Sequence, residues 1–199
     1  RAVRSKLDPN QHNRNRFFRT EIKPVDGMTN FILPLQNTRD CRFKDFIAFN
    51  QLNKESMAFV KMLFSEKNLD SDMKVGFKGN PNIGSVVLNQ FADSQQYKDF
   101  SNSFEDGDRI FIISSIFGGT GASGFPLLLK TLRSDKSSQS WKFVSQAKIG
   151  AVTVLPYFNV TEEENSGVDS STFISKTKSA LAYYKKNISD NSSINALYY

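Results

Sequence analysis

A glycine-rich turn, Gly118-Gly-Thr-Gly-Ala-Ser-Gly124, interrupts the most apolar part of this 199-residue chain. Residues 108–116 before the turn are β-branched and aromatic without polar alternation, which predicts a buried strand. Residues 127–132 after it hold four leucines and predict a helix, with Pro126 in its first turn. A buried strand, a tight turn and a helix in this order are typical of α/β folds.

Further strands and helices alternate along the chain. Apolar spacing predicts strands over residues 29–35, 73–77, 147–155 and 194–199, and helices over 43–52, 53–64, 83–91 and 173–184. This alternation predicts an α/β fold with three Rossmann-like layers, a mostly parallel sheet and helices on both faces. The length favours a single domain.

The net charge of +6 is concentrated at the start of the chain. Residues 1–23 hold seven basic residues against two acidic ones, a net charge of +5. We therefore expect a basic, flexible arm over residues 1–28 and a folded domain over residues 29–199. Because the folded part lacks a basic surplus, we do not expect nucleic acid as a partner. Residue 1 is Arg and not Met, so we expect the chain to belong to a longer protein.

The composition excludes several classes of site. A single cysteine, Cys41, and a single histidine, His12, leave no internal disulfide, no soft-ligand metal cluster and no Ser-His-Asp or Cys-His arrangement. The longest apolar run, residues 110–117, is too short to span a bilayer. We therefore predict a cytoplasmic protein with no membrane partner, no metal site and no assigned catalytic residue.

The glycine-rich turn has the composition of a phosphate-binding loop. Main-chain N–H groups at a helix N-terminus bind anions, and glycines let the main chain approach the ligand closely. Gly118, Gly119, Gly121 and Gly124 provide such an approach, and the Thr120 hydroxyl adds a donor. A second loop, residues 79–84, follows the strand predicted over 73–77, so we expect it at the same edge of the sheet.

Two alternatives to a mononucleotide site stay open. Residues 119–124 match the G-x-G-x-x-G pattern of dinucleotide-binding folds, which would indicate an NAD(P)-binding oxidoreductase domain. In such folds an acidic residue stands at the end of the next strand, about 20 residues on. Here the first acidic residue after the strand predicted over 147–155 is Glu162. The other alternative is a non-catalytic α/β interaction module whose turn binds no ligand.

Three stretches in one order resemble the tubulin and FtsZ superfamily. They are residues 118–122, similar to its Gly-Gly-Thr-Gly signature; residues 79–84, similar to the Ala-Asn-Pro-Glu-Ile-Gly loop of FtsZ; and residues 149–158, similar to the strand after the signature. The resemblance covers about residues 73–199. Phe117, Ser123 and Asn82 depart from the family pattern.

The resemblance implies a partial GTP-binding domain. The residues it assigns to the nucleotide phosphates are Gly79, Asn80, Gly118, Gly119, Thr120, Gly121, Ala122 and Ser123, and it assigns Glu162 to the ribose. It implies GTP as the ligand, with or without Mg²⁺, and self-association in a filament-forming GTPase. Residues 1–28 lack the first diphosphate loop of that family, so hydrolysis is expected only if the parent protein supplies the missing loops.

Overall fold

The computed structural model describes residues 35, 38, 40–74, 76–134, 136, 140–157 and 172–199. They belong to a unit that extends from Leu33 to Tyr199. The arm predicted over residues 1–28 lies outside the described residues, as does all but Leu35 of the strand predicted over 29–35.

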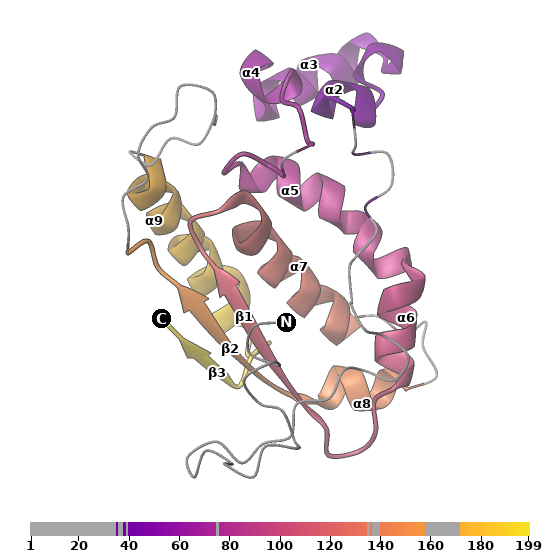
Figure 1. The fold of residues 1–199 in the computed structure, drawn as a ribbon, viewed down its shortest axis with the longest axis vertical. Coiled ribbons are helices and arrows are strands. Elements are labelled where there is room, and N and C mark those ends of the chain that lie inside the picture. The colour runs from indigo at the N-terminus through magenta and orange to yellow at the C-terminus, as the bar shows by residue number, and fades with distance from the viewer. Residues whose placement is uncertain are drawn as a thin grey trace, which may run out of the picture. The chain divides into compact units, whose positions relative to one another are not determined.

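The described part of the chain is an α/β fold with a three-stranded parallel sheet (Figure 1). The strands are β1 (Arg109–Ser115), β2 (Lys148–Val154) and β3 (Ala196–Tyr198). The helices before the sheet are α2 (Phe43–Phe46), η1 (Phe49–Gln51), α3 (Lys54–Leu63), α4 (Glu66–Leu69), α5 (Pro81–Leu88), η2 (Asn89–Asp93) and α6 (Gln95–Asn102). Those between the strands are α7 (Gly119–Ser134), α8 (Trp141–Gln146), α9 (Phe173–Tyr184) and the π-helical η4 (Lys185–Ser189). The predicted α/β class and parallel sheet are confirmed.

The strands pair in chain order, β1 with β2 and β2 with β3. Arg109 pairs with Lys148 at one end of β1, and Ser115 pairs with Val154 at the other. Parallel neighbours need a crossover connection, which α7 and α8 supply between β1 and β2. The carboxyl ends of β1 and β2 therefore lie at one edge, where the glycine-rich turn begins.

One face of the sheet packs against helices. Ile149 and Ala151 of β2 are fully buried in a cluster with Leu129 of α7 and Tyr184 of α9. Such burial of apolar side chains is the main stabilising term of the fold. On the other face, Phe111 and Ile113 of β1 are exposed within the described part of the chain, at 59% and 73%.

The sequence predicted Pro126 in the first turn of its helix, but the structure has it in the middle of α7. The reason is that the helix already begins at Gly119. Pro126 has no N–H, so the carbonyl of Ala122, four residues earlier, loses its helical partner. The Tyr184 hydroxyl donates to that carbonyl at 3.1 Å. Burial raises the pKa of the Tyr184 phenol well above its usual value, so the group stays a donor. This bond joins α9 to the first turn of α7.

Replacing Tyr184 with phenylalanine is expected to lower the free energy of unfolding by about 1–2 kcal/mol, because a buried carbonyl loses its donor. Urea denaturation measures the change. Tyr183→Phe is the matched control, since Tyr183 is 52% exposed one position earlier on the same helix. An equal effect of the two substitutions would show that the buried bond does not stabilise α9 on α7.

A second apolar cluster joins the first helices to α5. It contains Phe43 of α2, Phe64 after α3, Phe77, and Ile83 and Val87 of α5. The N-cap predicted at Asn53 is confirmed, because its side chain accepts from Ser56 N at 2.8 Å.

Two elements predicted in this region are wrong. The helix predicted over residues 43–52 is divided at Ala48, whose φ of 50° is left-handed. The strand predicted over residues 73–77 is absent at the described residues of that stretch, and Gly76 has a φ of 85°. The apolar side chains of Met73 and Phe77 are buried in the cluster of helices and not in a sheet.

Candidate phosphate-binding site

The glycine-rich turn lies at the carboxyl end of β1 and begins α7. β1 ends at Ser115, and α7 starts at Gly119 and runs for 16 residues. The first four N–H groups of a helix have no carbonyl partner within it, so Gly119 to Ala122 present main-chain donors at this end. Together with the helix dipole, these donors favour an anion.

A second helix begins next to α7. α5 starts at Pro81, which suits a first helical position because its missing N–H would have no partner there. Asn80 is the N-cap residue, but its side chain makes no capping hydrogen bond. Gly79 before it has a φ of 70°, a left-handed conformation that glycine adopts without a steric penalty. The Asn80 N–H donates to the Phe77 carbonyl at 2.8 Å, and Pro81 has no N–H, so the donors left in the first turn of α5 are those of Asn82 and Ile83.

The starts of α5 and α7 touch through glycines. A Cβ atom placed on Gly119 would lie 3.0 Å from the Asn80 nitrogen. One placed on Gly84 would lie 2.8 Å from the Gly119 carbonyl oxygen. In Figure 1 both helices start near the arrowhead of β1. The two loops therefore lie together, as the sequence predicts, although a helix contact and not a pair of neighbouring strands unites them.

Packing accounts for three of the glycines in and around the turn. Gly84 and Gly119 allow the helix contact, and a Cβ on Gly121 would overlap the Ser115 carbonyl oxygen and lie 2.9 Å from the Ser115 nitrogen. Gly118 is different, because the nearest atom to a Cβ there is the Ser115 hydroxyl oxygen at 3.5 Å. Its φ is also outside the left-handed region. Neither packing nor conformation requires a glycine at position 118.

The side chains predicted to accompany the turn have different surroundings. Thr120 is exposed, so its hydroxyl is accessible at the start of α7. Ala122 is buried, with its carbonyl bound by Tyr184. Ser123 is buried too, and its hydroxyl donates to the Gly119 carbonyl at 2.6 Å. Glu162, predicted to contact a ribose, lies outside the described residues.

Helix α9 adds side chains that the sequence did not identify as part of this site. The ring of Phe173 packs against Phe117, directly before the turn, with 5.4 Å between centroids. The ammonium nitrogen of Lys176 lies 3.4 Å from the position a Cβ would take on Gly79. One sequence signal pointed to this helix, the amphipathic stripe of residues 173–184. The sequence does not show which loops this stripe contacts.

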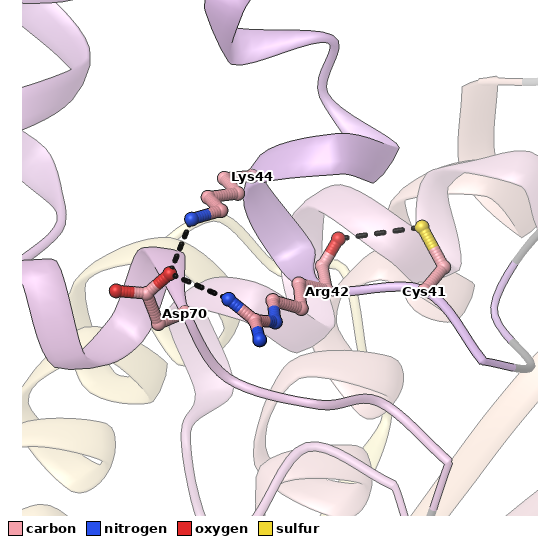
Figure 2. Close-up of polar contacts among 4 residues, drawn as sticks. All are labelled: Cys41, Arg42, Lys44 and Asp70. Atoms are coloured by element: carbon pink, nitrogen blue, oxygen red, sulfur yellow. Dashed lines mark hydrogen bonds and ion pairs between the residues drawn. The ribbon is translucent and has the colours of Figure 1, made fainter.

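Away from the glycine-rich turn, an open hollow is lined by Asp40, Cys41, Arg42, Asp70 and Asp72. Figure 2 shows that Asp70 is already paired, with Lys44 at 2.6 Å and Arg42 at 3.5 Å. The hydrogen bond from Lys44 is the main reason why the pKa of Asp70 lies below its usual value. Cys41 donates to the carbonyl of Arg42 in the same view. These contacts indicate a surface ion-pair cluster.

The described residues provide neither a metal site nor a membrane-spanning helix. They contain no group of three or more His, Cys, Asp or Glu side chains placed to hold a metal ion. None of the helices in the described part combines the length and the apolar character needed to cross a membrane. Comparison of the whole chain with protein-family models, with curated proteins and with solved structures finds no match.

Proposed function

We propose that this chain binds the phosphates of a nucleotide at the adjoining starts of α5 and α7. The residues concerned are Gly79–Asn80 and Gly118–Ala122, called the phosphate site below. The approach of Asn80 to Gly119 carries the proposal, because it brings the donors of two helix starts to one place. GTP is the proposed nucleotide, in keeping with the tubulin-like and FtsZ-like order of the loops.

Two further features support a nucleotide over a simple anion. Parallel strands joined in chain order by helices form one half of a doubly wound sheet, the architecture that commonly binds mononucleotides and dinucleotides. Such sheets bind their ligands beyond the carboxyl ends of the strands, which is where Gly118 lies after β1. Hydrolysis, Mg²⁺ binding and filament formation stay predictions from the resemblance.

Replacing Gly118 with alanine is expected to weaken GTP binding at least tenfold while leaving the melting temperature unchanged. The free protein has room for the extra methyl group, since nothing lies within 3.5 Å of it. A phosphate held by the main chain does not have this room, because glycine there permits the close approach. Isothermal titration of the chain with GTP measures the affinity.

Gly124→Ala is the matched control for this substitution. Gly124 lies inside α7, and a Cβ there would meet only a methyl group of Leu88 at 3.4 Å. The control should therefore bind GTP like the unmodified chain. If GTP binds equally well to both variants, the turn is not its site. A titration with NAD⁺ in parallel tests the oxidoreductase alternative, which predicts that NAD⁺ binds and GTP does not.

A further inference from the structure

A buried stripe of α9 runs along the glycine-rich turn. Phe173 at its start packs on Phe117, and Tyr184 at its end donates to the carbonyl of Ala122. Thr177 lies on the same buried stripe, one turn after Phe173 and two turns before Tyr184. Phe117 and Ala122, which these two aromatic residues contact, enclose residues 118–121 in the sequence.

The Thr177 hydroxyl has no hydrogen-bond partner in the part of the chain that the structure describes. The residue is 7% exposed, and its Oγ1 atom makes no hydrogen bond. An unpaired buried hydroxyl is destabilising and rare, so it calls for an explanation. A ligand bound at the turn would give this hydroxyl an acceptor.

The neighbouring Lys176 carries a positive charge to the other loop of the phosphate site. Its ammonium nitrogen lies near Gly79, and the side chain is partly buried. None of the ion pairs found among the described residues involves Lys176. Among the described residues, two helix starts and the Lys176 ammonium thus contribute positive charge to this place, and no ion pair there offsets the ammonium.

We infer that α9 completes the phosphate site, with Lys176 and Thr177 binding the phosphate chain of a nucleotide. This inference rests on the proposed function and adds to it a ligand class and a basis for selection. A lysine ammonium suits phosphate as a compact point charge, and its attraction grows with the charge of the ligand. The site therefore selects nucleotides by their number of phosphates and favours a triphosphate over a monophosphate.

Lys176→Met tests the charge. We expect GTP and inorganic tripolyphosphate to bind ten- to a hundredfold more weakly to this variant, the loss typical of one charge-assisted hydrogen bond. Binding of GMP should change much less, so the preference for the triphosphate falls. Lys178→Met is the matched control, because Lys178 is exposed two positions later on the same helix. Isothermal titration of the full 199-residue chain gives all the affinities.

Thr177→Val tests the hydroxyl and separates a binding role from a structural one. Valine has nearly the same shape and removes an unpaired buried group, so the melting temperature should stay equal or rise. GTP affinity should nevertheless fall about fivefold, the loss of one neutral hydrogen bond. A hydroxyl that only stabilises the fold would give a lower melting temperature and an unchanged affinity.

The outcomes distinguish this inference from the proposed function. If neither GTP nor tripolyphosphate binds the unmodified chain, both fail. If both ligands bind and Gly118→Ala weakens them, while Lys176→Met and Thr177→Val bind them normally, the proposed function stands and the role of α9 is overturned. Weaker binding in both α9 variants, with Lys178→Met unchanged, supports the inference.

Discussion

Replacing Gly121 with alanine is expected to lower the free energy of unfolding by about 3 kcal/mol, the upper part of the range for overpacked sites. The added methyl group would overlap the Ser115 carbonyl oxygen, and Ser115 is the last residue of β1. Main-chain atoms held in a sheet cannot move aside as a flexible side chain can. For a domain of this size, the loss corresponds to a fall in melting temperature of roughly 6–12 °C.

Gly118→Ala is the control for this prediction, since it makes the same chemical change three positions earlier, where the new methyl group meets only an ordinary contact with the Ser115 hydroxyl at 3.5 Å. Thermal and urea unfolding of the two variants should differ clearly. If Gly121→Ala is as stable as Gly118→Ala, then α7 does not pack against the end of β1 as described. The pair also separates stability from binding, because only position 118 leaves the fold unaffected.

Replacing Arg133 with methionine is expected to cost about 3–4 kcal/mol of stability. The guanidinium donates to three main-chain carbonyls, those of Ser145 at 2.7 Å, Ala147 at 2.8 Å and Ser193 at 2.8 Å. Hydrogen bonds from a charged donor are worth more than neutral ones, and methionine would leave all three carbonyls without this donor. Arg133 thus connects the end of α7 to the segments that lead into β2 and β3.

Lys130→Met is the matched control for Arg133→Met. Lys130 is exposed one turn earlier on α7, so its loss should change stability by less than about 0.5 kcal/mol. Urea denaturation followed by circular dichroism compares the two variants. Equal midpoints would show that the three carbonyl bonds contribute nothing to the stability of the sheet.

Much of the sheet could be predicted from the sequence, because its signals are local. The apolar runs of β1 and β2 predict strands, and the structure has both, although β1 exposes Phe111 and Ile113 where burial was predicted. The stripe over residues 173–184 matches α9 residue for residue. The stretch 73–77 misled because Met73 and Phe77 have the spacing of a strand but pack in a cluster of helices. Burial alone does not distinguish these two environments.

The candidate site was only partly predictable. A glycine can be required by a turn, by a close packing contact or by a bound ligand, and the sequence alone does not distinguish these roles. The structure assigns Gly119 and Gly121 to packing and leaves Gly118 without such a role. The role of α9 in the site could not be predicted, because Lys176 lies near Gly79 in space but 97 positions away in the sequence.

Main-chain amide chemical shifts give the most direct test of the phosphate site, since the proposed contacts are N–H groups. The measurement is a titration of the isotope-labelled chain with GTP, followed residue by residue. Our account predicts that the largest shifts fall on Gly79–Asn80 and Gly118–Ala122, with smaller ones at Lys176 and Thr177. The account is contradicted if GTP leaves these amides unchanged, or if the shifts gather elsewhere, such as on the exposed face of β1.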